Sequence, residues 1–162
     1  MAAPSYRLLV VDDSKRDTLL LERILQQASD ADATFTVTHM ESAQAGLEEL
    51  STQAYDLVLL DYYLPDMDGI AFLAEKQQRG LTTPVIMLTA FGQERLPVAA
   101  LQAGALDYFR KDQVNSSLLG KAIQQAIEKA RLQESAAADA ARLHELEELV
   151  ARLQQQLTEQ QS

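Results

Sequence analysis

Cysteine is absent from the 162 residues of this chain. Its absence excludes a disulfide framework, a thiolate metal site and a cysteine nucleophile, and it fits a protein of the reducing cytoplasm. The chain also lacks an apolar run long enough to span a bilayer, and the segment from Met1 to Tyr6 has neither the charged start nor the cleavage site of a secretory signal. We therefore expect a soluble protein that does not enter membranes.

Positive charge is scarce. Fourteen Lys and Arg stand against 24 Asp and Glu, and the resulting net charge of -10 repels phosphate backbones unless the basic residues gather on one face. The tail from Arg131 onward holds three arginines against six carboxylates, which is the wrong sign for a basic DNA-binding helix. Direct binding to nucleic acid is not expected.

Short apolar runs alternate five times with amphipathic stretches of helical length. The expected strands cover residues 6–11, 34–38, 56–60, 85–89 and 107–109. The first, third and fourth runs are almost unbroken Leu, Val and Ile, which is typical of parallel strands covered on both faces, whereas the second alternates like an edge strand. Because parallel strands need crossover helices, the pattern predicts a doubly wound α/β domain with a five-stranded parallel sheet.

Two serines mark expected helix starts. Ser14 and Ser42 each precede a helical stretch and are suited to cap free backbone amides, with Asp17 three residues after Ser14. In the first helix Leu20, Ile24 and Ala28 recur at a spacing of four, which predicts one buried stripe.

Charged and polar residues close the strands, and ligand sites of such sheets lie beyond the carboxyl ends of the strands. Asp12 and Asp13 follow the first strand, while Asp61, Thr89 and Lys111 follow the third, fourth and fifth. Three clustered carboxylates repel one another unless a cation lies between them, and Mg²⁺ favours such oxygen ligands. The set predicts an Asp61 nucleophile that attacks phosphorus, with Lys111 and Thr89 contacting the phosphoryl oxygens.

Four motifs together resemble the receiver domain of response regulators in two-component signalling. They are Leu-Val-Val-Asp-Asp-Ser at 9–14, Leu-Asp-Tyr-Tyr-Leu-Pro-Asp-Met-Asp-Gly at 60–69, Leu-Thr-Ala at 88–90 and Tyr-Phe-Arg-Lys at 108–111. The resemblance covers about residues 5–130. It implies a CheY-like, flavodoxin-like fold with strand order 2-1-3-4-5.

The resemblance also implies roles for individual residues. Asp12, Asp13 and Asp61 would hold Mg²⁺, together with the backbone carbonyl of Tyr63, and Asp61 would be the phosphoacceptor. The phosphoryl donor would be a histidine kinase or a phosphotransfer protein. The chain would accept phosphoryl groups in a phosphorelay rather than act as a conventional enzyme, and autodephosphorylation at the same site is a further expectation.

By the same resemblance, Thr89 and Lys111 would contact the phosphoryl group, and Tyr108 would be the aromatic that turns inward when Thr89 moves. Two further aromatics, Tyr63 and Phe91, flank the expected site and either shield it from water or merely cover the loops. The chain departs from the family where Asp112 replaces the usual proline after Lys111, so that turn is expected to differ. His39 indicates only ordinary polar surface.

The C-terminal region predicts one long helix. Residues 117–160 contain no proline and one glycine, Gly120, in a run rich in Ala, Leu, Glu, Gln and Arg. Its first part should pack on the sheet through Leu119, Ile123, Ala126 and Ile127. We expect a receiver domain over 5–130 and a coiled-coil helix over 131–162.

The coiled-coil seam is formed by apolar residues that alternate at three and four: Leu143, Leu146, Val150, Leu153 and Leu157. In a parallel homodimer Arg142 would face Glu147 of the partner helix, which is an attractive pair. The alternative is a lone helix whose stripe packs back on the receiver or frays.

Three other functions stay open. A haloacid dehalogenase-like phosphatase also uses an aspartate and Mg²⁺, but it needs Asp-x-Asp after the first strand. A flavodoxin-like cofactor binder needs a phosphate loop there, and residues 12–16 do not resemble one. A pseudo-receiver would serve only as a dimerisation scaffold. The sequence does not identify the output: the chain is expected to be either a fragment of a longer regulator or kinase, in which the coil leads to an effector, or a complete single-domain protein.

Overall fold

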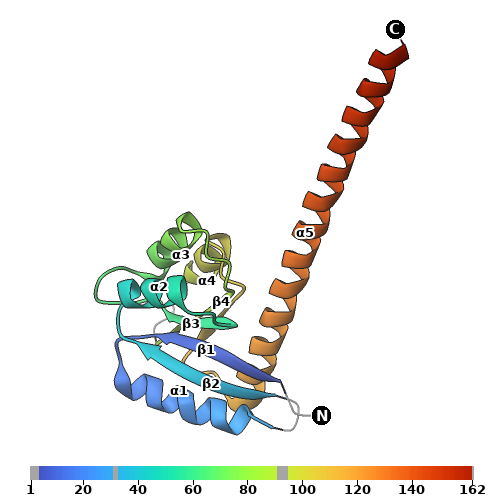
Figure 1. Ribbon diagram of the computed structural model, residues 1–162. Coiled ribbons are helices and arrows are strands. Elements are labelled where there is room, and N and C mark those ends of the chain that lie inside the picture. Colours follow the sequence, from blue (N-terminus) through green and yellow to red (C-terminus); the bar gives the residue numbers. More distant parts are fainter. Residues whose placement is uncertain (1–3, 31–32, 91–94, 162) are drawn as a thin grey trace. The chain divides into compact units, whose positions relative to one another are not determined.

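A computed structural model describes residues 4–30, 33–90 and 95–161 (Figure 1). Its strands are β1 (Ser5–Val11), β2 (Thr34–Met40), β3 (Leu57–Asp61), β4 (Val85–Thr89) and β5 (Asp107–Arg110). They form one parallel sheet in the order β2-β1-β3-β4-β5. The predicted doubly wound α/β fold, its strand order and the edge position of the second strand are confirmed.

The helices are α1 (Lys15–Ala28), α2 (Ala43–Thr52), α3 (Gly69–Gln78), α4 (Leu96–Gln102) and α5 (Ser116–Gln161). Figure 1 shows α1 on one side of the sheet, with α2, α3 and α4 on the other. The predicted caps of α1 and α2 are confirmed, because the Ser14 and Ser42 hydroxyls accept the backbone N–H groups of Asp17 and Ala45.

Alternation along the strands divides the core into two layers. Leu8 and Val10 of β1 pack with residues of α1 and the first part of α5, whereas Leu9 and Val11 pack with residues of α2 and α3. Every residue of β3 and β4 is buried. Because β3 and β4 bury both faces, their sequences are unbroken apolar runs rather than alternating ones.

The predicted stripe of α1 was right only in part, because Ile24 and Ala28 pack against the core but Leu20 does not. The buried residues are Thr18, Leu21 and Leu25, while Leu20 is 48% exposed and Ile24 is only half-buried. Three consecutive leucines occupy 19–21, so a spacing of four fits Leu21 and Leu25 as well as it fits Leu20 and Ile24. Packing against the sheet selects the former pair.

Contacts divide the chain into two units, Met1–Ile127 and Glu128–Ser162. Within the first unit, Leu119, Ile123, Ala126 and Ile127 of α5 are buried in the core, as predicted. The second unit consists of the remainder of α5, and its described side chains are exposed except that of Ala130, which is half-buried. No helix in the described ranges is both long enough and apolar enough to cross a bilayer.

Candidate functional site

The carboxyl edge of the sheet brings the predicted acidic residues together. Asp12 follows β1, and Asp61 is the last residue of β3, the next strand in the sheet. Carboxylate oxygens of Asp12, Asp13 and Asp61 all lie within 4.8 Å of one another. Asp12 and Asp61 are buried, at 3% and 8% exposure, whereas Asp13 is exposed. Two buried carboxylates and one exposed carboxylate therefore share one small volume.

Lys111 lies among these carboxylates. Its Nζ donates hydrogen bonds to Oδ2 of Asp12 at 2.5 Å, of Asp17 at 2.9 Å and of Asp61 at 3.3 Å. The backbone fixes its position, because the N–H of Lys111 donates to the carbonyl of Thr89 at 2.8 Å just beyond the β4–β5 pairing. Thr89, the last residue of β4, is fully buried.

The pKa values of Asp61 and Lys111 reflect this crowding. Burial, with a further contribution from the negative charge of Asp12, raises the pKa of Asp61 to about 6, although Lys111 opposes the shift. Burial alone would lower the pKa of Lys111, but its hydrogen bonds to Asp12 and Asp17, together with the negative charges of Asp61 and Asp12, outweigh burial and raise it. Near neutral pH the site therefore holds an ionised Asp61 and a protonated Lys111.

A cleft of about 330 Å³ opens over Asp61. Its lining comprises Asp13, Ser14, Asp17, Asp61, Tyr63, Ala90 and Lys111. Tyr63 is 44% exposed, its ring meets that of Tyr62 edge-on at 4.7 Å, and its backbone N–H lies 3.4 Å from Asp61 Oδ1. Phe91, the second predicted flanking aromatic, lies outside the described residues. Tyr63 thus borders the space that a ligand of Asp61 would occupy.

Asp17 is a site residue that the sequence did not reveal. Its position after Ser14 suggested a helix cap, and its backbone N–H does donate to Ser14 Oγ at 3.2 Å. Its carboxylate, however, accepts from Lys111 Nζ instead of returning to the backbone of Ser14, whose N–H donates to Asp12 Oδ1 at 2.8 Å. Its position on the first turn of α1, just beyond Asp12, was the only available signal.

The expectation that His39 is ordinary polar surface was wrong. Its ring is half-buried, and Nε2 lies 2.6 Å from the carbonyl oxygen of Asp12 and 3.1 Å from Thr18 Oγ1. A carbonyl accepts only, so Nε2 carries the proton in that contact. His39 thereby ties the end of β2 to the loop that carries Asp12, a contact that follows from the register of the edge strand.

Tyr108 packs on the layer formed with α2 and α3. It lies opposite Met87 in the β4–β5 pairing. Its hydroxyl oxygen is buried and has no hydrogen-bond partner among the described residues. Burial raises the pKa of this hydroxyl. The hydroxyl therefore remains protonated, and no described residue satisfies it in this conformation.

A family profile for the response regulator receiver domain matches residues 8–124. The chain belongs to this family. Receiver domains of response regulators are phosphoacceptors that take phosphoryl groups from histidine kinases and bind Mg²⁺ at an acidic site. In this receiver domain, Asp12, Asp13 and Asp61 form the acidic cluster at that site.

The transcriptional regulatory protein DltR of Streptococcus agalactiae is 38% identical over 115 residues, which is 71% of this chain and 49% of DltR. The chain spans about half or less of the length of the curated relatives that it matches. Among solved structures, the receiver domain of a LuxO repressor protein from Vibrio parahaemolyticus is 26% identical, with a TM-score of 0.71, over 82% of this chain and 97% of that one.

The receiver domain of the sensor histidine kinase PA1611 from Pseudomonas aeruginosa is 26% identical, with a TM-score of 0.65, over 76% of this receiver chain and 98% of that one. That structure has a magnesium ion coordinated in the active-site cleft. The clustered oxygens of Asp12, Asp13 and Asp61 are donors of the kind that Mg²⁺ takes, and their mutual repulsion favours a cation. The residues at this edge of the sheet therefore fit the ion.

Proposed function

We propose that this receiver accepts a phosphoryl group on Asp61, in a Mg²⁺-dependent reaction, from a histidine kinase or a phosphotransfer protein. The observation that carries the proposal is the contact of Lys111 Nζ with Asp61 Oδ2 inside a cleft also lined by Asp13. A nucleophile, a cation and a metal-binding carboxylate thus surround one space. The proposal involves no direct contact of the chain with nucleic acid or a membrane.

The metal would be held by the carboxylates of Asp12, Asp13 and Asp61 and by the backbone carbonyl of Tyr63. When bound, Mg²⁺ supplies positive charge that stabilises the phosphoryl oxygens during transfer. Asp13 and Asp61 both line the cleft, and Asp13 is exposed, whereas Asp12 and Asp61 are buried. This arrangement leaves room for phosphate oxygens and water as further ligands.

In the reaction, a carboxylate oxygen of Asp61 forms a bond to phosphorus. With acetyl phosphate as donor, the bond from phosphorus to the acetyl oxygen breaks, and acetate leaves with the electron pair. Lys111 donates hydrogen bonds to the phosphoryl oxygens, and Thr89, which ends the neighbouring strand, supplies a hydroxyl. Because the pKa of Asp61 is about 6, this carboxylate is ionised and nucleophilic at neutral pH.

Tyr108 would report the phosphorylation to the surface. A buried hydroxyl without a partner is unfavourable, and this oxygen has none among the described residues, which favours a conformation in which it gains one. We infer that movement of Thr89 toward the phosphoryl group changes the packing of Tyr108, which lies on the neighbouring strand. The residue thereby couples the site to a surface next to β5.

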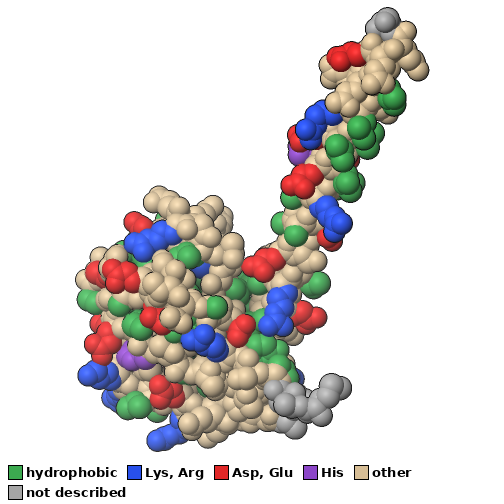
Figure 2. All heavy atoms as spheres, in the orientation of Figure 1, with side chains coloured by type: hydrophobic (Ala, Val, Ile, Leu, Met, Phe, Trp, Pro, Cys, Tyr) green, Lys and Arg blue, Asp and Glu red, His purple; other side chains and the backbone are tan. Residues whose placement is uncertain are grey.

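The second unit would pair with a second copy of the chain. Hydrophobic side chains gather along one side of this segment in Figure 2, and the seam residues Leu143, Leu146, Val150, Leu153 and Leu157 are 50–60% exposed. A parallel pair buries this stripe and places Arg142 beside Glu147 of the partner helix. We infer that phosphorylation alters this pairing and that the pairing is linked to an output.

Labelling by a small phosphodonor tests the proposal. Incubation with acetyl phosphate and Mg²⁺ should give a shifted band on phosphate-affinity electrophoresis, and Asp61→Asn or a chelator should abolish the shift. A shift that survives either change contradicts the assignment, and no shift at all favours a pseudo-receiver scaffold. Steady phosphate release that is lost in Asp12→Asn but kept in Asp61→Asn would favour a haloacid dehalogenase-like phosphatase.

A further inference from the structure

Asp17 contacts the site residues but has no part in the phosphoryl transfer described above. It lies in the first turn of α1, where its backbone N–H is fixed by Ser14 Oγ. A negative charge is favoured at this end of a helix, because the free backbone amides carry partial positive charge. From there its carboxylate reaches Lys111 Nζ at 2.9 Å and lines the same cleft as Asp61. Asp17 is thus a fixed counter-ion on the α1 side of Lys111.

The Lys111 ammonium group donates hydrogen bonds to three carboxylates. The group has three N–H donors, and it has acceptors at hydrogen-bonding distance in Asp12, Asp17 and Asp61. To donate to a phosphoryl oxygen, Lys111 must therefore give up at least one of them. The resting arrangement satisfies the ammonium group fully and competes with its contact to the phosphoryl group.

The three partners are not equivalent. Asp61 would carry the phosphoryl group, and Asp12 would face the metal, so both change their bonding when the site is used. Asp17 belongs to neither set, and its bond to Lys111 is shorter than the 3.3 Å bond from Asp61. The Asp17–Lys111 contact is therefore expected to persist when Asp61 carries the phosphoryl group and Asp12 faces the metal.

We propose that Asp17 is a positioning residue that holds Lys111 in its resting place and so limits the rate at which Asp61 accepts a phosphoryl group. The inference rests on the proposed function, because it concerns the same transfer to Asp61. It adds a restraint on that transfer, built into the first turn of α1.

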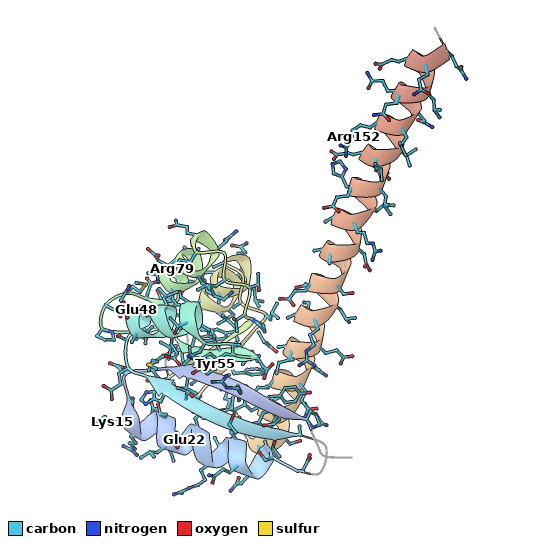
Figure 3. The ribbon with its side chains drawn as sticks, viewed as in Figure 1. Lys15, Glu22, Glu48, Tyr55, Arg79 and Arg152 are labelled. Carbon is cyan, nitrogen blue, oxygen red and sulfur yellow. The ribbon has the colours of Figure 1, made fainter. Side chains whose placement is uncertain are left out.

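The rate test uses the full chain with acetyl phosphate at saturating Mg²⁺. Asp17→Asn should raise the initial rate of Asp61 labelling roughly threefold to tenfold, the size expected for loss of one partly exposed, charge-assisted contact. Glu22→Gln is the matched control, since Glu22 lies on the same helix (Figure 3) and loses the same charge. The control should label at the wild-type rate.

The same substitution in a Lys111→Ala background separates positioning from simple charge repulsion. If Asp17 acts through Lys111, Asp17→Asn should change the rate in that background no more than Glu22→Gln does. An equal acceleration with and without Lys111 would mean that Asp17 merely repels the anionic donor, and the positioning role would be overturned.

Unfolding of the metal-free chain supplies a readout that does not depend on transfer. Asp17→Asn should shift the urea midpoint in the wild-type background but much less in Lys111→Ala, because the two side chains share one ion pair. Additive shifts would overturn the pairing. A chain that labels on Asp61 at the same rate with and without Asp17 refutes only this inference, whereas a chain without Asp61 labelling refutes the proposed function as well.

Discussion

At the scale of single residues, the site is a set of carboxylates that are costly to bury together. Asp61 is 8% exposed, and both its burial and the nearby Asp12 disfavour its ionised form. The positive charge of Lys111 favours the ionised form of Asp61 but offsets only part of this effect. These buried carboxylates are therefore expected to lower the free energy of unfolding of the metal-free protein, while they form a site that can bind a cation and a phosphoryl group.

Asp61→Asn should stabilise the metal-free chain at pH 7. The pKa of Asp61 is raised from 3.8 to about 6, so between these values the folded protein binds more protons than the unfolded one, and stability falls as pH rises through this window. Across this window the wild type loses about 3 kcal/mol of folding stability, since each pKa unit corresponds to about 1.4 kcal/mol. The gain from Asp61→Asn is at most this amount, because Asn also loses the ionic contact with Lys111.

Urea unfolding in a chelating buffer at pH 5 and pH 7 measures this effect. The wild type should lose stability between the two pH values, and the variant should lose less. A variant that is less stable than the wild type at pH 7 would show that the ion pair with Lys111 dominates over burial. Added Mg²⁺ should stabilise the wild type more than the variant.

Tyr63→Asn should shorten the lifetime of the phosphorylated state by roughly a few-fold, because a partly exposed aromatic beside Asp61 restricts the approach of water. The decay of labelled protein after removal of the donor measures it. Tyr63→Phe retains the ring and should decay like the wild type. An unchanged decay rate in Tyr63→Asn would mean that the ring only covers the loop.

The sequence predicted the site residues that follow the ends of strands, but not the residues on other elements whose side chains contact the site. Asp12, Asp13, Asp61 and Lys111 could be placed together because parallel strands end at one edge of the sheet. Asp17 could not, because its carboxylate direction depends on how α1 begins. His39 could not either, because its contact with the Asp12 carbonyl depends on strand register.

At the scale of elements, the loop between β3 and α3 is fastened to the start of α2. Asp66 of this loop accepts the backbone N–H groups of Ala43 at 2.9 Å and Gln44 at 2.8 Å. Ser42 satisfies the N–H of Ala45 in the same turn. The loop that carries Tyr63 is therefore held by the cap of a neighbouring helix.

Asp66→Ala should lower the free energy of unfolding by about 1 kcal/mol, the usual effect of losing a helix cap. Burial tends to raise the pKa of Asp66, but hydrogen bonds from Gln44 and Ala43 outweigh it, so the pKa is lowered. This stabilisation is present above the ordinary pKa of aspartate and is lost as pH falls through the lowered value.

Urea unfolding of the wild type and Asp66→Ala at pH 7 and pH 3 measures this prediction. The difference between the two proteins should shrink at pH 3. Asp66→Asn keeps one acceptor and should give an intermediate value. Equal stability of all three proteins at pH 7 would show that Ser42 alone caps α2.

Strands were easier to predict than helix faces. Their apolar runs are short and bounded by turns, and the predicted bounds differ from the observed ones by at most two residues at either end. The face of α1 was predicted only in part, because adjacent leucines fit two phases and only packing in the core separates Leu20 from Leu21. The β3–α3 loop was not predictable in detail, since its anchor lies on another helix.

At the scale of the whole molecule, a receiver unit and a separate helical unit share one continuous helix, α5. The family explains the receiver, but the curated relatives extend well beyond the length that this chain covers. The helical unit has no core of its own among the described residues. A second copy of the chain is the proposed partner of its seam.

Val150→Asp should disrupt the proposed dimer, because a buried charge at a central seam position is costly. Ala151→Asp is the matched control, since it places the same charge on the adjacent, outward position. Light scattering at micromolar concentration should give a dimer for the wild type and the control and a monomer for Val150→Asp. A monomeric wild type would contradict the dimer.

Orientation of the pair is tested by disulfide trapping. Leu146→Cys and Leu153→Cys should each crosslink to the same residue of a second copy if the helices run parallel and in register. The chain has no native cysteine that would interfere. Crosslinking of Leu146→Cys only with a different seam position would contradict the parallel arrangement.

Direct mapping of the modified residue tests the central claim, that this receiver is phosphorylated on Asp61. After incubation with acetyl phosphate and Mg²⁺, borohydride reduction converts an acyl phosphate into a stable alcohol that tandem mass spectrometry can locate. The account predicts reduction at Asp61 alone, dependent on donor and metal. Reduction at Asp12 or Asp13 instead, or none at Asp61 in a folded chain, would contradict it.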